Sequence, residues 1–447
     1  MANPFWDDFC AAVFGETVPE FTSRGQGHLP SFYRVSDFAE ASIALAGTAL
    51  ARLGGGGSVE VDRRLASLWF DMTLAPVGWE APSLWDAVAG DYPCRDGWIR
   101  LHTNAPHHRD AALAVLQTPA DRAAVADAVL QWDGAALESA VVAQGGCAAQ
   151  MRSGAQWQSH PQGRAVRAEP LVQWQDHGDC TPFAPFSGPD LAGVKVLDLT
   201  RVLAGPVATR FLAGFGADVL RIDPPSWNEP SVEMEVTLGK RCAGLDLRRA
   251  GDLAHLKELI READVFVHGY RADALDRLGL GDEVRRALNP SLIDVRLNAY
   301  GWSGPWRGRR GFDSLVQMSC GIAAHGMAQA GAERPTPLPV QALDHATGYL
   351  MAACVLQGLA ARQQGRVTSA RLSLARTAQS LMQQRCARET QGAIVKEAAD
   401  FSDEIEQTGW GRAQRIKPPI RVNGKPPVWR IGAGPLRRDE ASFGQGD

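Results

Sequence analysis

Asp344 is the most prominent candidate for chemistry, because it lies in the otherwise apolar stretch VQALDHATGYLMAA, residues 340–353. Aspartate has a low helix propensity and is rarely buried unpaired. One interpretation is an N-cap, in which the carboxylate accepts a backbone hydrogen bond and stabilises a helix by about 1 kcal/mol. The other is a nucleophile, because a helix dipole can keep a desolvated carboxylate ionised for attack on an activated carbonyl. Residue chemistry alone favours the cap.

Basic residues suggest a second site. They recur at predicted loop positions, several of them after predicted strands: Arg201, Lys240, Arg241, Arg271, Arg277, Arg307, Arg309 and Arg310. If some converge at one edge of a sheet, they suit a ligand with several phosphates, although a solvated charged rim is the alternative for any one of them. The turn AGP, residues 204–206, leads onto a predicted helix whose N-terminus also favours phosphate, or it is an ordinary β–α turn.

Other chemistries lack their sequence signatures. The ten histidines show no metal-ligand spacing, and neither Lys nor Ser/Thr opens a helix after the glycine run 54–57. Asp223 ends the second predicted strand, where dinucleotide-binding folds hold an acid, but the preceding turn RVLAGPVAT lacks the GxGxxG fingerprint. The sequence therefore disfavours a nicotinamide or flavin enzyme, and we expect no metal and no permanently bound cofactor.

Composition narrows the class of protein. The 447 residues are 45% hydrophobic and 21% charged, which allows large packed cores. A net charge of -4 gives no reason to expect nucleic acid or a membrane surface as a partner. The eight cysteines are dispersed, and the acidic N-terminus is unlike a signal peptide, so we expect a cytoplasmic protein with reduced thiols.

Strands and helices alternate in the second half of the chain. Apolar strand patterns cover residues 194–200, 217–223, 244–247, 264–270 and 291–300, with amphipathic helices such as 253–263 between them. This alternation predicts an α/β fold with a Rossmann-like parallel sheet, whose ligands bind at the carboxyl ends of the strands. The arginines and the AGP turn would then share one edge.

The chain divides into five predicted regions. These are a lead-in (1–30) that looks irregular, a mostly helical segment with one short β stretch (31–175), a linker (176–192), a Rossmann-like domain (193–385) and a C-terminal extension (386–447). The segment from Arg34 also echoes the segment from Gln341, with Asp37 and Asp344 at the same place in an Asp, helix, glycine turn and β pattern. Duplication and chance similarity of Ala-rich helices are about equally good explanations.

Several ordered motifs resemble the class III CoA-transferases, the CaiB/BaiF family. They include VKVLDLTRVLAGPVATRFLAGFGADVLRIDPP, GFDSLVQMSCGI and PLPVQALDHATGYLMAACVLQGLAAR, spread over about 190 residues. The segment DGWIRLHTNAPHHRDAALAVL more weakly resembles the small α+β domain of that family. The resemblance implies a CoA-handling fold, acyl-CoA and a carboxylic acid as substrates, and an interlocked homodimer.

The resemblance also implies roles for particular residues. Asp344 falls where the family has its nucleophile, which passes through an acyl anhydride to an aspartyl-CoA thioester. The residues that resemble CoA contacts are Arg201, Val202, Leu203, Ala204, Tyr270, Arg277, Leu278 and Arg310.

Two alternatives stay open. The chain could be a non-catalytic acyl-CoA-binding homologue. It could also be a racemase or epimerase, since the family includes α-methylacyl-CoA racemases with a GHD-like motif. Here that motif reads Gly311–Phe312–Asp313, and Phe312 cannot exchange a proton, which disfavours two-base chemistry.

Overall fold

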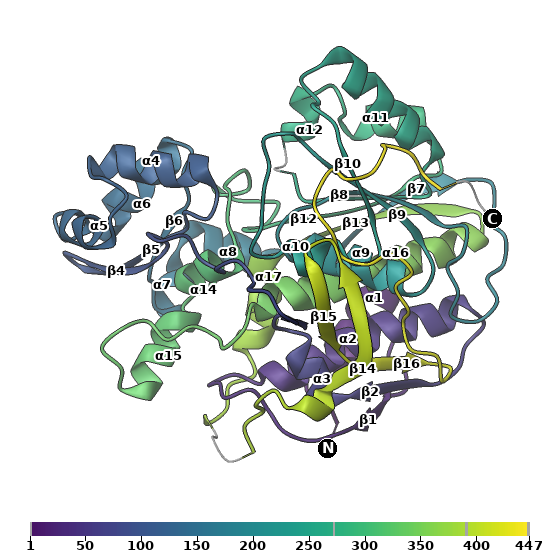
Figure 1. The fold of residues 1–447 in the computed structure, drawn as a ribbon, viewed down its shortest axis with the longest axis horizontal. Coiled ribbons are helices and arrows are strands. Elements are labelled where there is room, and N and C mark those ends of the chain that lie inside the picture. Colours follow the sequence, from purple (N-terminus) through teal and green to yellow (C-terminus); the bar gives the residue numbers. More distant parts are fainter. Residues whose placement is uncertain (1, 271–272, 389–391, 445–447) are drawn as a thin grey trace.

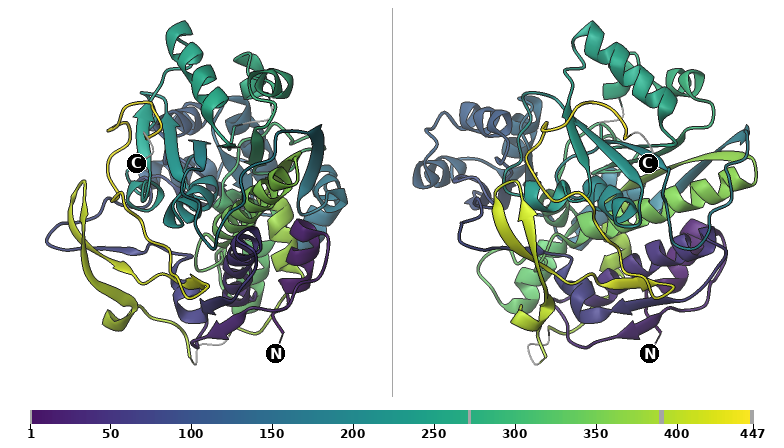
Figure 2. Two further views of the ribbon diagram at one scale, coloured as in Figure 1. Left: turned by 90° about the vertical axis from the view of Figure 1, so that its right-hand side faces the viewer. Right: turned by 45° about the vertical axis from the view of Figure 1, so that its right-hand side comes forward.

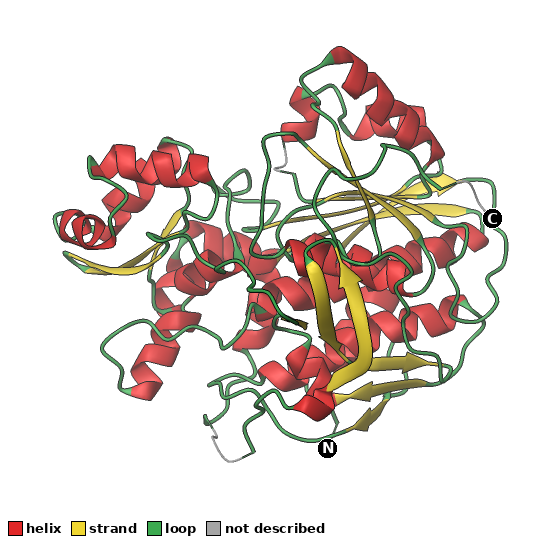
Figure 3. Ribbon diagram, in the orientation of Figure 1, coloured by secondary structure: helices red, strands yellow, loops and turns green. Residues whose placement is uncertain are grey.

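A seven-stranded sheet organises the computed structural model, which describes residues 2–270, 273–388 and 392–444 (Figures 1 and 3). The strand order is β10-β9-β8-β11-β12-β13-β7, and every neighbouring pair is parallel except β13 and β7. The strands are β7 (Gln173–Asp179), β8 (Lys195–Leu199), β9 (Asp218–Asp223), β10 (Arg241–Gly244), β11 (Val265–His268), β12 (Ile293–Asn298) and β13 (Arg366–Ser373). The predicted Rossmann-like parallel sheet is confirmed, and its order reverses between β8 and β11.

Helices cover both faces of this sheet because its buried strands present apolar side chains alternately to each side. Val196 and Val219 belong to one core and Leu197 and Leu220 to another. The first core lies under α9 (Ala204–Gly214) and α16 (Ala342–Gln363), and the second under α11 (Ala250–Glu262), on the opposite side in Figure 1. The remaining helices of this half are α10 (Glu233–Val236), α12 (Ala274–Arg277), α13 (Asp282–Leu288), α14 (Asp313–Cys320), α15 (Ile322–Ala330) and α17 (Leu374–Met382).

A smaller α+β unit projects on the left of Figure 1 and has its own apolar core. Its antiparallel sheet joins β4 (Gly90–Cys94), β5 (Gly97–Leu101) and β6 (Ala148–Gln150). Its helices are α4 (Pro106–Leu116), α5 (Arg122–Val129) and α6 (Gly134–Ala143), and α7 (Gly154–Ser159) and α8 (Pro161–Ala168) lead back to β7. In this unit, β5 and α4 are formed by the segment DGWIRLHTNAPHHRDAALAVL.

The two ends of the chain share two small sheets (Figure 2). One joins β1 (Thr22–Arg24), β2 (Val59–Asp62) and β16 (Ile420–Val422), and the other joins β3 (Leu74–Pro76), β14 (Phe401–Thr408) and β15 (Gly411–Ile416). The helices α1 (Trp6–Phe14), α2 (Val35–Leu53) and α3 (Arg63–Leu68) and the turn η1 (Ala398–Asp400) complete this layer. The C-terminal extension therefore folds onto the first part of the chain.

Three sequence predictions need correction. The third strand of the parallel sheet, β10, covers residues 241–244 and not 244–247, because its register is set by pairing with β9. The predicted linker begins inside β7, a polar edge strand whose side chains give no apolar alternation. The lead-in is not irregular throughout, because residues 6–14 form α1, whose Phe9 packs its ring 5.7 Å from that of Phe38.

The described residues include no helix long and apolar enough to cross a membrane.

Candidate active site

The turn between β8 and α9 is strained and firmly held. Val202 has a φ of +64°, a conformation that a β-branched residue adopts only at a cost of about 1–3 kcal/mol. Its N–H donates a hydrogen bond of 2.9 Å to Oε2 of Glu229, which also accepts from the Trp227 indole. Arg221 in turn pairs with Glu229 and with Asp223 inside the core. This buried network holds Val202 in its strained conformation.

Asp344 is not the N-cap of its helix. The helix α16 begins at Ala342 with Gln341 as N-cap, which places Asp344 third in the first turn. The capping role belongs to Asp313, whose Oδ2 accepts from the N–H groups of Leu343 at 2.8 Å and Asp344 at 3.0 Å. The cap interpretation of Asp344 is therefore wrong, and its own carboxyl is left for other contacts.

Burial sets the protonation of this carboxyl. Asp344 is 7% exposed, and in the described part of the chain it forms no ion pair. Loss of solvent, followed by the nearby charge of Asp313, raises the pKa of Asp344 well above its ordinary value. Burial likewise raises the pKa of Asp313 to about 6. Burial and the Asp313 carboxyl thus disfavour the ionised form of Asp344, contrary to the expectation that the helix dipole keeps it readily ionised, and the two carboxyls titrate as a pair.

A close helix contact fixes where Asp344 lies. A Cβ added to Gly348 would approach the carbonyl oxygen of Ala204 to 2.4 Å, so only glycine lets α16 touch the start of α9 at this point. The second turn of α16 therefore meets the first residue of α9, and Asp344, one turn earlier, lines the same cavity as the β8–α9 turn.

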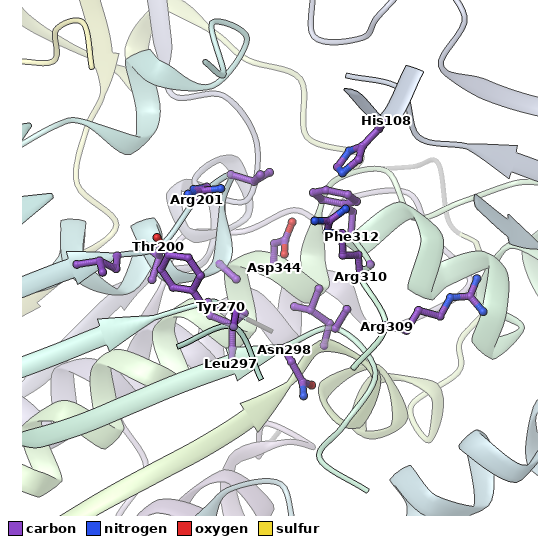
Figure 4. A pocket seen from close by; sticks show the side chains of 18 of the residues that line it. His108, Thr200, Arg201, Tyr270, Leu297, Asn298, Arg309, Arg310, Phe312 and Asp344 are labelled. Atoms are coloured by element: carbon purple, nitrogen blue, oxygen red, sulfur yellow. The ribbon is translucent and has the colours of Figure 1, made fainter. Parts of the chain in front are cut away.

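The first cavity, of about 340 Å³, opens where β8, β11 and β12 end (Figure 4). Figure 4 shows Asp344 between Arg201 and Tyr270 on one side and Phe312 and Arg310 on the other. Four arginines line this cavity: Arg201, Arg307, Arg309 and Arg310. The cavity therefore occupies the position at which doubly wound sheets bind ligands, with a positive lining suited to phosphates.

The second cavity, of about 400 Å³, lies on the other side of Asp344. It shares Val202, Trp227, Phe312 and Asp344 with the first cavity. Side chains from the small α+β unit also line it, among them His102, whose ring stacks on Phe312 with centroids 3.8 Å apart. Asp344 thus stands where the two cavities meet.

The predicted CoA contacts divide into two groups. Arg201, Val202, Ala204, Tyr270 and Arg310 line the first cavity, while Leu203 lines the second. Arg277 and Leu278 lie at the far end of α12, whose first residue Ala274 reaches the first cavity, and neither of them lines it. Arg277 instead pairs with Asp273, with a nitrogen–oxygen distance of 2.5 Å. Their role in CoA binding stays a prediction.

The other predicted basic residues are only partly brought together. Arg307 and Arg309 line the first cavity, but the Arg309 guanidinium is paired with Glu138 at 3.1 Å. Lys240 is fully buried against Asp198 at 3.1 Å, and Arg241 pairs with Asp218. Arg271 lies outside the described residues.

Several lining residues were missed by the sequence analysis. Trp227 contributes to both cavities, His107 and His108 to the first and His102 to the second. The histidines come from the small unit, far away in sequence, and only their place in the segment that resembles the small domain could have pointed to them.

Comparison with known proteins relates the chain to one family. Residues 191–406 match the sequence model of CoA-transferase family III. Among curated proteins, the chain is 38% identical over 201 residues to the acetyl-coenzyme A transferase nodX of Hypoxylon pulicicidum, covering 44% of this chain and 33% of that protein. It is 35% identical to the succinate–glutarate CoA-transferase of Agrobacterium fabrum over 31% of this chain and 39% of the relative.

Solved structures overlap with the chain only in part. The Rv3272 protein of Mycobacterium tuberculosis, in its orthorhombic form, is 30% identical with a TM-score of 0.40, over 45% of this chain and 57% of that one. A CaiB/BaiF family protein from Brucella suis is 22% identical with a TM-score of 0.37, over 50% and 64%. The chain spans a third to a half of the length of the curated relatives described above and of similar acyl-CoA transferases.

Proposed function

We propose that this protein is a CoA-transferase that moves CoA from an acyl-CoA to a free carboxylic acid, with Asp344 as nucleophile. The observation that carries the proposal is the position of Asp344, a buried carboxyl without an ion-pair partner among the described residues, where a basic cavity meets a second cavity. The match of residues 191–406 to the sequence model of CoA-transferase family III supports the same activity.

The two cavities suggest how an acyl-CoA binds. The phosphates of CoA lie against the arginines of the first cavity, and the thioester reaches Asp344. A thioester is an activated carbonyl, and a carboxylate with a raised pKa is a stronger nucleophile once ionised. A site largely screened from water also limits hydrolysis of the reactive intermediates.

The reaction proceeds by two exchanges at this carboxylate. An Asp344 oxygen attacks the acyl carbon, the carbon–sulfur bond breaks, and an acyl-aspartyl anhydride and CoA thiolate result. The thiolate attacks the aspartyl carbonyl carbon, which releases the donor acid and leaves an aspartyl-CoA thioester. The acceptor carboxylate attacks this thioester in the same way, and the returning thiolate takes the acceptor acyl group and restores Asp344.

Asp313 is the positioning residue of this scheme. Its carboxylate binds the two N–H groups that begin α16, and the Gln317 side chain binds Asp313 from the other side. A rigid helix start keeps Asp344 aimed at the thioester, which matters because catalysis depends on alignment of the reacting atoms.

Covalent trapping tests the proposal. Incubation of the protein with an acyl-CoA donor should give an adduct on Asp344 that hydroxylamine removes, and labelled CoA should exchange between two acids. Asp344→Asn should abolish both signals, while Asp37→Asn, at the equivalent place in the other helix, serves as the matched control. Absence of any adduct or exchange with a broad panel of acids would sink the transferase proposal.

Two alternatives give different results. A non-catalytic homologue would bind acyl-CoA and show no adduct. A racemase would incorporate deuterium from heavy water at the α-carbon of a 2-methylacyl-CoA. Burial lowers the pKa of His102 and of His345 to about 3, so both imidazoles are neutral and weak acids at pH 7, which gives the racemase no support.

The resemblance further implies an interlocked homodimer, and the cysteine pattern a cytoplasmic location. We include both in the proposal, together with the absence of a permanently bound cofactor. Light scattering coupled to gel filtration tests the dimer, and an absorbance spectrum with metal analysis of the purified protein tests the cofactor expectation.

A further inference from the structure

The second cavity differs from the first in charge. Aromatic and aliphatic side chains form much of its wall, including Phe70, Met72, Leu84, Trp85, Phe312 and Val340. No arginine or lysine is among the described residues that line it, whereas four arginines line the first cavity. The basic lining of the first cavity and a lining without arginine or lysine therefore meet at Asp344.

Two carboxylates in the wall of the second cavity are paired with arginines that do not line it. Asp86 binds Arg109 at 3.1 Å and the hydroxyl of Thr103 at 2.8 Å. Glu235 binds Arg210 at 2.8 Å and the backbone N–H of Thr73 at 2.7 Å. Both arginines are therefore held by protein carboxylates and are absent from the cavity lining.

Two cations stack on aromatic rings of this wall, and neither of them lines the cavity. Arg100 stacks over the ring of Trp85 at 4.8 Å, and its guanidinium binds Asp91 at 2.8 Å. Arg201, which lines the first cavity, lies over the ring of Trp227 at 4.6 Å. A negatively charged group inside the second cavity would thus find no arginine or lysine in the described lining.

We propose that the second cavity receives the acyl group, and that it selects acyl chains with no charge at their far end, aliphatic or aromatic monocarboxylic acids, over dicarboxylic acids. This inference rests on the proposed function, because it assigns the cavity relative to Asp344. The physical reason is desolvation: a distal carboxylate would lose its water without gaining a cation, which is strongly unfavourable. A volume of about 400 Å³ falls within the range of small-molecule sites.

A matched pair of donors tests the selectivity. Pentanoyl-CoA and glutaryl-CoA have the same chain length and differ in a terminal methyl group or carboxylate. We expect kcat/KM for CoA exchange to be at least about 100-fold higher for pentanoyl-CoA, since a site without a partner for a charged group rejects it strongly. Equal values within threefold would overturn the inference and leave the transferase proposal intact.

Binding separates the inference from the proposed function. The thioether S-pentyl-CoA and its analogue with a terminal carboxylate cannot transfer, and calorimetric titration gives their affinities even if no exchange occurs. The uncharged thioether should bind at least about 30-fold more tightly, because both share the CoA part and differ only at the far end. Equal affinities would refute the selectivity whether or not the protein is a transferase.

A single cation should reverse part of the preference. Leu84 lines the second cavity and is 44% exposed, so Leu84→Arg should fold, and Leu84→Met is the matched control. The arginine should shift the glutaryl-to-pentanoyl ratio, or the corresponding affinity ratio, by at least about tenfold towards the dicarboxylate, with the affinity for CoA alone unchanged. A ratio unchanged in Leu84→Arg would refute the assignment of this cavity to the acyl group.

Discussion

Two helix–strand–helix segments of the chain have the same order of elements, but the aspartate near the start of each lies in a different environment. The first repeat is α2–β2–α3 and the second is α16–β13–α17. Their first helices pack against each other (Figure 2), and each begins after an N-cap of nearly the same conformation, with φ of −74° and ψ of 59° at Arg34 and φ of −77° and ψ of 62° at Gln341. Asp37 and Asp344 are the third residues of these helices, which favours duplication over chance similarity.

The difference lies in what surrounds each carboxyl. Asp37 binds Arg63, the first residue of α3, with a nitrogen–oxygen distance of 3.0 Å. The first residue of α17 is Leu374, which lines the first cavity. One aspartate is thus neutralised by a cation, while the other faces a cavity. One backbone plan thus carries a carboxyl in an ion pair in the first repeat and a buried carboxyl at a cavity in the second.

The largest expected effect is on catalysis. Asp344→Asn should lower the rate of CoA exchange by about 1000-fold or more, because an amide cannot form the anhydride. Asp37→Asn should change the rate by less than about twofold, since Asp37 lines neither cavity. Steady-state exchange assays measure both, and equal losses in the two variants would break the distinction between the repeats.

An arginine introduced into the second repeat, at the position that corresponds to Arg63 of the first, should slow CoA exchange. Leu374→Arg puts a guanidinium where Arg63 stands relative to Asp37, which would lower the pKa and the nucleophilicity of Asp344 and occupy space in the first cavity. We expect about 100-fold slower exchange, with Leu374→Met close to the unmodified protein. If Leu374→Arg retained its rate within threefold, the correspondence of these two positions would be wrong.

The glycines of the two first helices should also respond differently. A Cβ at Gly348 meets the backbone oxygen of Ala204 at 2.4 Å, whereas one at Gly47 meets the end of the Ile420 side chain at 2.3 Å. Gly348→Ala should therefore destabilise the protein by about 2 kcal/mol, and Gly47→Ala by less than about 1 kcal/mol, because a side chain can move and α9 cannot. Urea unfolding monitored by circular dichroism compares them. A smaller loss for Gly348→Ala would contradict the tight contact.

The smallest expected effect is on the pH dependence of the free energy of unfolding. The folded-state pKa values of Asp313 and Asp344 are raised above their unfolded values, Asp313 to about 6, so the native state holds protons that the unfolded chain has released. The stability that these protons provide is complete below about pH 4 and is lost as pH rises through the folded pKa values. Asp344→Asn removes the titrating carboxyl. The difference in free energy of unfolding between this variant and the unmodified chain should therefore be about 1 kcal/mol more favourable at pH 7 than at pH 4.

The control for that experiment is again the first repeat. Asp37→Asn weakens an ion pair with Arg63 and should slightly destabilise the protein at pH 7, so the two substitutions have opposite signs. Thermal unfolding at pH 4 and pH 7 tests this. If Asp344→Asn lowered the free energy of unfolding at pH 7, burial of the Asp344 carboxyl would not be destabilising at that pH.

The sequence predicted the parallel sheet well because its strands are buried on both faces and read as runs of Val, Ile and Leu, as in VKVLDL. It missed β7 because QWQDHGD is a polar edge strand that only its pairing with β13 reveals. It missed α1 because no side chain caps this helix, which depends on contacts of Phe5 and Phe9 with Phe38.

The sequence also predicted part of the candidate site. Local order brings several predicted residues to one edge of the parallel sheet, because each of them follows a strand or begins a helix. They are the turn at residues 201–204, Tyr270, Arg310 and Asp344. Arg277 could not be judged in this way, because its distance from the cavity depends on how α12 turns.

The sequence alone predicts the alternation of strands and helices in the parallel part of the sheet, the turn that precedes α9, and the place of Asp344 near the start of a helix. The tertiary structure decided the chemistry of that carboxyl. Asp313 caps its helix, no cation neutralises it among the described residues, and the small unit brings His102 onto Phe312 beside it. Local order follows from neighbouring residues, whereas a pKa and the charge of a cavity depend on distances between groups far apart in the chain.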